Sequence, residues 1–345
     1  MVERRVLKTL LLASVMALGG CLAQSPEHTA ARVVHGRTVA ATPAASPSVP
    51  IQRPSPSFSP SPAPHDFSDV VTRLQDLGYL PLAHAHIHGK DGNIRHDAWL
   101  WPVPTALQNA ADEYPWNDGN PFIRGAVIQF ERANGILGPK GVSEGKLHKA
   151  VIKALFGKHA KPDLWPYEWV SVTKANSTRQ PEQLHIWEHG KGWIWHTVVN
   201  TGVLGSTPDG TWPIYQRLPK TTMRGVFPQP ISWAVYHALA GQQVPQWAGS
   251  SLMQSARGTV GGSPVRWVPY NDPGILWVNY FDDGRGIHYY PRAGYGFPQS
   301  AGCVEEPYNA APFTYRLLHY GVPVTVSGAI FGLAIPTHGT QAKED

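Results

Sequence analysis

The sequence predicts a multidomain protein, in which a mainly β domain over residues 165–330 follows a small three-helix domain over residues 67–160. Apolar residues recur at helical spacing in the first region, and the apolar period shifts towards two residues from Trp169 onward. A proline-rich stretch precedes both regions. With 345 residues, the chain is long enough for two domains that each bury a core.

The N-terminus has the features of an export signal. Basic residues among the first eight precede an apolar stretch over 9–18, which is too short to span a bilayer. The sequence Leu18-Gly19-Gly20-Cys21 then resembles a bacterial lipobox. We therefore expect a lipoprotein signal peptide over 1–21, with Cys21 lipidated and a location outside the cytoplasm. The alternative is an ordinary signal peptide cleaved near Ala23.

Residues 22–66 are predicted to be a disordered linker. From Thr42 to Pro64 every second or third residue is proline, interleaved with serine and alanine. Such a sequence cannot bury a core and favours an extended polyproline conformation. At that rise per residue the linker reaches up to ~140 Å. It would act as a spacer or tether.

Three helices are predicted in the next region, over 67–77, 121–134 and 144–156. Gly78 stands where a C-cap glycine belongs, and Ser143 is a candidate N-cap for the third helix. The net charge of +5 includes +2 from residues 1–20, and no basic helix is evident, so we expect no nucleic-acid partner.

Three alternating histidines, His84, His86 and His88, lie between the first two helices. On a strand they would share one face and could bind zinc. The alternative is a polar surface loop, which we favour because no spaced fourth ligand is evident. We expect no metal and no cofactor.

Short alternating segments in the C-terminal half predict strands and turns. Residues 169–172 read as a strand and 184–199 as a hairpin. An insertion is expected at about 229–266, with helical content at 232–240, and a polar tail at 331–345.

Cys303 is the candidate nucleophile. If Cys21 is lipidated, Cys303 is the only free thiol of the mature chain. Gly302 before it allows a tight turn, so that backbone N–H groups converge on an oxyanion. His288 ends an apolar run one loop earlier and is suited to accept the thiol proton. The alternative is an inert buried thiol.

The element Ser300-Ala301-Gly302-Cys303-Val304-Glu305-Glu306-Pro307, with a histidine one loop before it, resembles the YkuD-type L,D-transpeptidases of peptidoglycan. That family carries Ser/Thr-His-Gly-Cys-x-Arg, so Ala301 fills a histidine slot and Glu305 the arginine slot. The phrases Thr207-Pro208-Asp209-Gly210-Thr211 and Tyr270-Asn271-Asp272-Pro273-Gly274 are also similar to this family, and the resemblance covers most of 165–330.

The helical region also resembles a known module. Leu74-Gln75-Asp76-Leu77-Gly78-Tyr79-Leu80 and Ala126-Val127-Ile128-Gln129-Phe130-Glu131 are similar to the three-helix peptidoglycan-binding domain. Together the resemblances imply a β-sandwich-like catalytic domain with a short helix after the cysteine. A peptidoglycan-binding module would precede this domain in the sequence.

The resemblance implies roles for single residues. Cys303 would be the nucleophile and His288 its base, oriented by the backbone carbonyl of Tyr289. The N–H groups of Gly302 and Cys303 would form the oxyanion hole. Further expected substrate-binding residues are Ser300, Arg292 and Tyr290, and either Arg292 or Arg285 would compensate for the missing arginine.

The implied activity is that of a cysteine acyltransferase of the EC 2.3.2 type, which cross-links tetrapeptide stems in cell-wall biogenesis. Its partners would be peptidoglycan and, through the lipid anchor, the bacterial membrane, with the protein a monomer that faces the wall. Two alternatives are an L,D-carboxypeptidase-type hydrolase and a catalytically inactive wall-binding lipoprotein. A papain-like protease is disfavoured, because there the cysteine precedes the histidine.

Overall fold

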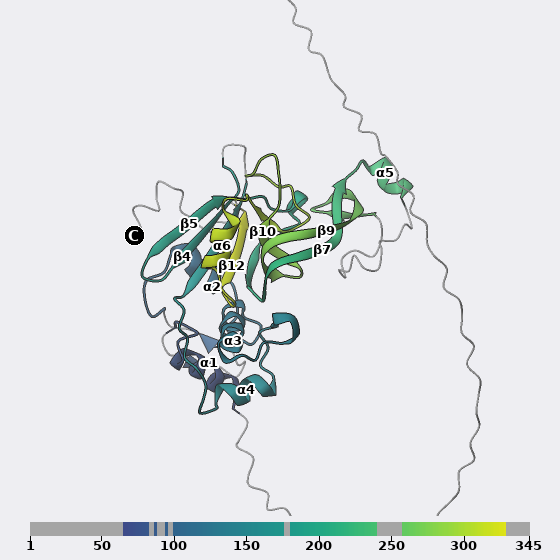
Figure 1. Cartoon of the computed structure of the whole chain (residues 1–345). Helices are drawn as coiled ribbons and strands as arrows, with labels where there is room; N and C mark the ends of the chain where they lie inside the picture. The colour runs from purple at the N-terminus through teal and green to yellow at the C-terminus, as the bar shows by residue number, and fades with distance from the viewer. Residues whose placement is uncertain are drawn as a thin grey trace, which may run out of the picture. The chain divides into compact units, whose positions relative to one another are not determined.

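Two five-stranded sheets form the C-terminal part of the protein in this computed structural model (Figure 1). The structure describes residues 65–82, 99–175, 180–239 and 257–328, together with the backbone of 86–87 and 94–95. All of them belong to a structural unit that spans Pro62–Asp345. The expected signal peptide with Cys21, the linker up to residue 64, the side chains of His84, His86 and His88, and the tail 331–345 lie outside the described residues.

The first sheet has the strand order β5-β4-β3-β12-β6. Strand β12 pairs parallel with β3 and antiparallel with β6, so the last described strand lies inside the sheet and not at its edge. The other pairs, β3 with β4 and β4 with β5, are antiparallel. The strands are β3 (Glu168–Lys174), β4 (Gln183–Glu188), β5 (Gly192–Val198), β6 (Gly210–Pro213) and β12 (Pro323–Gly328).

The second sheet has the order β11-β10-β9-β7, with β8 paired to β9 beyond this path. Strand β10 is parallel to β11 and antiparallel to β9, which brings the end of β10 beside the residues that follow the cysteine. The strands are β7 (Gln216–Pro230), β8 (Arg257–Val260), β9 (Ser263–Asp282), β10 (Arg285–Tyr289) and β11 (Val304–Glu306).

A hydrophobic core lies between the two sheets. Alternate residues of β3 and β12 face alternate residues of β10 and β11 there, and the buried members include Val170, Val326, Ile287 and Val304. The short helix α6 (Ala311–Leu317) follows the cysteine and packs against β9 and β10. The predicted mainly β, sandwich-like fold is thus confirmed.

Four α-helices in the described part of the chain precede the sheets, one more than expected, and a side chain caps the start of α1, α3 and α4 but not of α2. Asp66 forms a capping box with Asp69 at the start of α1, and Asn120 caps α3, whose first residue is proline. Gly135 ends α3 with a φ of 69°. The helices are α1 (Phe67–Asp76), α2 (Thr105–Asp112), α3 (Pro121–Asn134) and α4 (Lys149–Leu155).

The start predicted for the helix over 144–156, which corresponds to α4, is wrong. Helix α4 begins at Lys149, with the ring of His148 accepting a hydrogen bond from the Val151 N–H. Ser143 is buried, and its hydroxyl donates to the Glu131 carboxylate and accepts from the Gly145 N–H at 3.0 Å, so it closes a turn instead of capping the helix. Between Ser143 and the start of α4 the chain turns at Gly145, which has a φ of 62°.

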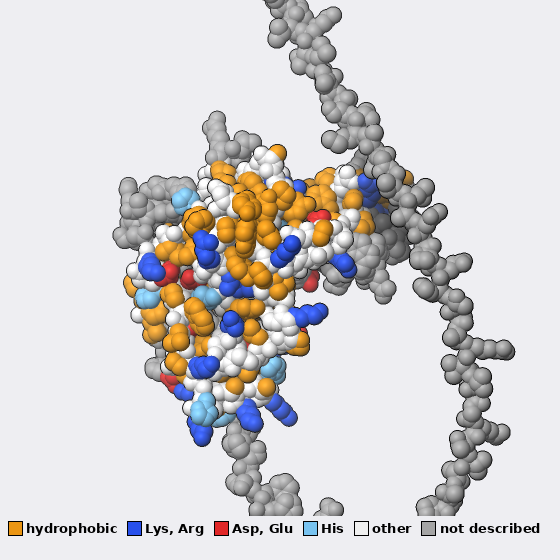
Figure 2. Space-filling model, viewed as in Figure 1, with side chains coloured by type: hydrophobic (Ala, Val, Ile, Leu, Met, Phe, Trp, Pro, Cys, Tyr) orange, Lys and Arg blue, Asp and Glu red, His pale blue; other side chains and the backbone are white. Residues whose placement is uncertain are grey.

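The buried side chains of the helical region form a cluster that is separate from the core between the two sheets. Trp169 and Trp187 of the first sheet join this cluster, and α3 packs against β6. Figure 2 shows Lys, Arg and His side chains on the part of the visible face where Figure 1 labels α1 and α4. No helix in the described part of the chain is long and apolar enough to cross a membrane.

The insertion expected at 229–266 lies at the end of a long hairpin. Strands β7 and β9 stay paired out to Pro230 and Val265, and the residues between these two connect the strands (Figure 1). That connection contains β8 and the helix α5 (Trp233–Ala238), which Ser232 caps. Residues 240–256 lie outside the described residues.

Candidate active site

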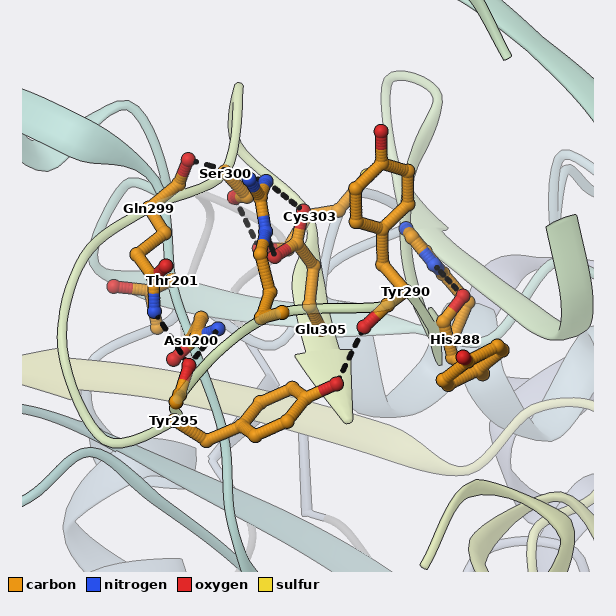
Figure 3. A network of polar contacts seen from close by, with 12 residues as sticks. Asn200, Thr201, His288, Tyr290, Tyr295, Gln299, Ser300, Cys303 and Glu305 are labelled. Carbon is orange, nitrogen blue, oxygen red and sulfur yellow. Dashed lines mark hydrogen bonds and ion pairs between the residues drawn. The ribbon is translucent and has the colours of Figure 1, made fainter. Parts of the chain in front are cut away.

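A pocket with a cavity volume of about 230 Å³ opens beside Cys303. Strands β7, β9 and β10 contribute to its wall, together with the loop that joins β10 to β11. Figure 3 shows His288, Tyr290, Cys303 and Glu305 in this region. The lining residues are Met223, Phe227, Tyr270, Asp272, Ile275, His288, Tyr290, Arg292, Ser300, Ala301, Cys303 and Glu305.

A larger cavity, of about 880 Å³, lies among α1, α3 and α4. Histidine and charged side chains line it, including His148, Arg124 and Lys146, but it contains no cysteine. Because nucleophilic chemistry needs a nucleophile and a base together, the smaller pocket is the candidate active site.

Cys303 is a free, half-buried thiol directly before β11. Its side chain packs against the apolar cluster of Met223, Ile275 and Val278. The Ser300 hydroxyl donates to the Cys303 carbonyl at 2.6 Å and accepts from the Gly302 N–H at 3.0 Å. The hydroxyl of Ser300 is therefore used to shape the turn that carries the cysteine.

The backbone at Gly302 requires glycine, as the sequence predicted. Its φ is +143°, and a Cβ there would lie 2.9 Å from Arg285 Nε and 3.0 Å from the Ser206 carbonyl oxygen. The buried Thr207 hydroxyl accepts from the Gly202 N–H at 2.7 Å and donates to the Gly302 carbonyl at 2.8 Å. The loop before β6 thus holds the turn in place.

One sequence expectation for the oxyanion hole does not fit this turn. The Gly302 N–H is engaged by Ser300 inside the loop, so it is not free to receive an oxyanion in the pocket. The physical reason is that a Ser at this position closes the turn with its own side chain. The Cys303 N–H remains as the backbone candidate.

His288 is buried and lies in the same pocket. Its Nδ1 is 2.9 Å from the Tyr289 carbonyl oxygen, and because a carbonyl only accepts, Nδ1 carries the proton of the neutral ring. Nε2 then has the lone pair and no well-aligned hydrogen-bond partner in the described part of the chain. The sequence expectation for the Tyr289 carbonyl matches this geometry.

The pKa of His288 is raised above its ordinary value by its surroundings. Burial is the largest single influence and lowers this pKa, but the charge of Cys303 and a hydrogen bond to its thiol, followed by the Tyr289 carbonyl, outweigh burial. The thiol is thus close enough to act on the ring, although the two are not aligned as a strong hydrogen bond. Such pairs often tighten only when substrate binds.

Glu305, at the position where the resembling family has an arginine, pairs with an arginine from the loop. Glu305 binds Arg292 through two contacts, Nε–Oε2 at 2.7 Å and Nη2–Oε1 at 2.8 Å. Arg292 also donates to the Gln299 carbonyl at 3.3 Å and lies 4.6 Å from the ring centroid of Tyr290. Arg292 therefore lines the pocket as expected, but with its charge already paired.

The second arginine considered from sequence lies elsewhere. Arg285 pairs with Asp282 at 2.8 Å and donates to the Ser206 carbonyl at 3.0 Å. It is not among the residues that line the pocket, because these partners hold it behind Gly302. Its contribution is to support the turn.

Five lining residues were not singled out from sequence, and the two polar ones, Tyr270 and Asp272, lie in the Tyr270-to-Gly274 phrase that suggested the family. Burial, followed by the charge of Cys303, raises the pKa of Tyr270, so its hydroxyl stays protonated and able to donate. Asp272 accepts a hydrogen bond from the Tyr290 hydroxyl at 3.3 Å. Tyr290 thus lies in the pocket as predicted, joined to Asp272 and to Arg292.

Comparisons with known proteins found similarity to solved structures. No protein-family profile and no curated protein sequence match the chain. Among the solved structures, an L,D-transpeptidase from Mycobacterium smegmatis is 14% identical over 46% of this chain and 59% of its own, with a TM-score of 0.29. One from Stackebrandtia nassauensis is 20% identical over 65% of this chain and 87% of its own, with a TM-score of 0.28. The catalytic domain of the Enterococcus faecium enzyme is 16% identical over 48% of this chain and 100% of its own, with a TM-score of 0.29.

Proposed function

We propose that this chain is a YkuD-type L,D-transpeptidase that cross-links peptidoglycan through a thioester on Cys303. The observation that carries the proposal is a free thiol in one pocket with a buried imidazole whose Nδ1 is fixed on a backbone carbonyl. This is the arrangement of a nucleophile, its base and the group that orients the base. The sequence element around Cys303 supports the same family.

The first half of the reaction acylates the enzyme. His288 Nε2 accepts the Cys303 proton, and the thiolate attacks the carbonyl carbon of the bond after the L-centre of the diamino acid in a tetrapeptide stem. When the tetrahedral intermediate collapses, the C–N bond to D-Ala breaks and the imidazolium returns its proton to the leaving amine. A thioester to the stem remains on Cys303.

The second half transfers the acyl group. The neutral His288 takes a proton from an incoming amine, which attacks the thioester carbon and expels the thiolate. The amine of a second stem completes a cross-link, whereas water would complete hydrolysis. The two outcomes share the same residues, so transpeptidation and L,D-carboxypeptidase activity differ only in the acceptor.

The oxyanion that forms in both halves needs donors near Cys303. The Cys303 N–H and the protonated hydroxyl of Tyr270 are the candidates, and loss of one such donor costs ~3 kcal/mol in the barrier. Ser300 and Thr207 act through the position of the turn.

The remaining expectations fit an enzyme of the cell envelope. Lipidation of Cys21 would anchor the mature protein, the linker over 22–66 would let it reach the wall, and the helical region would bind peptidoglycan. We further propose that it works there as a monomer. Each of these proposals rests on the sequence.

Incubation with purified tetrapeptide stem fragments tests the proposal. We expect D-Ala release together with a cross-linked dimer, both lost in Cys303→Ala. Release of D-Ala with tripeptide and no dimer would assign the hydrolase. Absence of any product from folded protein would favour a wall-binding protein without activity.

A further inference from the structure

The charges that line the pocket do not balance. Four lining residues besides Cys303 and the tyrosines are ionisable: Asp272, His288, Arg292 and Glu305. The Cys303–His288 pair adds no net charge, whether its proton sits on sulfur or on the ring. The pocket's charge is therefore set by two carboxylates and one guanidinium.

The guanidinium is already neutralised. Arg292 is the only Lys or Arg among the described residues that line the pocket, and Glu305 holds it in a two-point ion pair. The Glu305 side chain is 5% exposed, so water screens this pair weakly. Three of the five N–H groups of Arg292 are used by Glu305 and by the Gln299 carbonyl.

Asp272 is left as the uncompensated charge. It is partly exposed, lines the pocket, and forms no ion pair with a described residue; its hydrogen bond comes from the neutral Tyr290 hydroxyl. Arg224, which is paired across the strands with the neighbouring Asn271, donates to the side chain of Asn271 at 2.8 Å instead. The pocket thus carries one net negative charge.

We infer that Asp272 is a specificity-determining residue that binds the ammonium group of a diamino acid in the substrate. This inference deepens the proposed function and takes the identity of the ligand, a peptide stem, from it. An ammonium is a compact cation that matches a lone carboxylate, whereas a side-chain carboxylate would face repulsion from Asp272. The pocket therefore prefers stems with a free amine over stems with that amine acylated or with an added free carboxylate.

The ammonium has two sources in the proposed reaction, the acyl donor and the acceptor stem. Both present the same chemistry to Asp272. They differ in the half-reaction that loses rate when Asp272 is changed. Acyl-enzyme formation without acceptor reports on the donor, and transfer from a preformed acyl-enzyme reports on the acceptor.

Direct binding tests the inference without requiring turnover. The full chain carrying Cys303→Ala is titrated with three tetrapeptide stems that differ only in the diamino side chain: a free amine, an acetylated amine, and an amine with an adjacent carboxylate. We expect the first to bind about tenfold more tightly than the second, the size of one partly screened charge pair, and the third to bind less well than the first. Asp272→Asn should remove most of this preference.

Asp283→Asn is the matched control. It removes the same charge from an exposed position in the turn between β9 and β10, outside the pocket, and should leave the preference unchanged. In protein that retains Cys303, Asp272→Asn should slow acyl-enzyme formation or transfer. The step that slows shows whether Asp272 binds the donor or the acceptor. A preference that survives Asp272→Asn, a preference for the carboxylate stem, or no binding of any stem overturns the inference.

The test of Asp272 can succeed or fail independently of the test of the proposed reaction. Protein that prefers amine stems in binding but forms no thioester would refute the proposed reaction and retain the role of Asp272. Protein that forms the thioester with no preference among the stems would refute the role of Asp272 alone.

Discussion

The carboxylate of Glu305 holds the guanidinium of Arg292 through two charge-assisted hydrogen bonds, of 2.7 and 2.8 Å. Glu305 is two residues after the candidate nucleophile, and Arg292 is four residues after the candidate base. The pair therefore ties the loop between these two candidate positions to strand β11. It explains why an acidic residue fits the position where the resembling family has an arginine.

Loss of Arg292 should destabilise the protein, because it leaves Glu305 buried without its counter-charge. We expect Arg292→Met to lower the free energy of unfolding by about 2 kcal/mol, less than for a fully buried pair because the Arg292 side chain is 27% exposed. Urea unfolding measures this. The exchanged double variant, Arg292→Glu with Glu305→Arg, should recover part of the loss.

Arg224→Met serves as the control for this experiment, since Arg224 is exposed and bonds only to a neighbouring amide among its described contacts. Equal stabilities of the Arg292→Met and Arg224→Met variants would mean that the ion pair does not hold the loop.

Removal of the Thr207 hydroxyl should loosen the turn at the nucleophile. Thr207→Val keeps the shape but leaves the buried Gly202 N–H and Gly302 carbonyl without this partner, at a cost of about 2 kcal/mol in unfolding free energy. Acylation of Cys303 should slow as well, because the turn positions the thiol. Thr197→Val, whose hydroxyl makes a single long contact of 3.3 Å on β5, should change neither quantity. Normal acylation in Thr207→Val would show that the turn is held by other contacts.

The stability should fall with rising pH because of Glu306. Burial raises the pKa of this carboxyl to about 7, from 4.5, although a hydrogen bond from Thr314 and the charge of His288 act in the opposite direction. Below pH 4.5 the group is protonated in both the folded and unfolded states. As the pH rises from 4.5 to about 7, only the unfolded state loses the proton, so folding loses about 3 kcal/mol of stability.

Glu306→Gln should therefore flatten the pH dependence of unfolding. We expect the difference between the unfolding free energies at pH 5 and pH 8 to shrink by about 2.5 kcal/mol relative to the unaltered protein, because the unfolded carboxyl is already mostly ionised at pH 5. Glu113→Gln, at an exposed position, should leave that difference unchanged. An unchanged difference in Glu306→Gln would mean that this carboxyl is not held neutral in the folded state.

The sequence predicted a candidate nucleophile and a candidate base because both lie in a short, contiguous motif. A glycine before the cysteine and a histidine one loop earlier are local features, and the structure places them in one pocket. The need for glycine at position 302 also followed from local backbone geometry.

The pairing of Arg292 with Glu305 and the position of Asp272 could not be predicted, because they depend on how β9, β10 and the loop meet in space. The same holds for the shared core of the helices and Trp169, which arises from packing between segments far apart in the chain. Ser143 illustrates the same limit, since its buried partner Glu131 lies on another element.

The most direct test of the central claim is the intact mass of the protein after exposure to a carbapenem, a ring-strained acylating analogue of the stem's terminus. The account predicts one covalent adduct per chain, formed on Cys303 and absent from folded Cys303→Ala. No adduct on the folded unaltered protein, or an adduct that persists in Cys303→Ala, would contradict it.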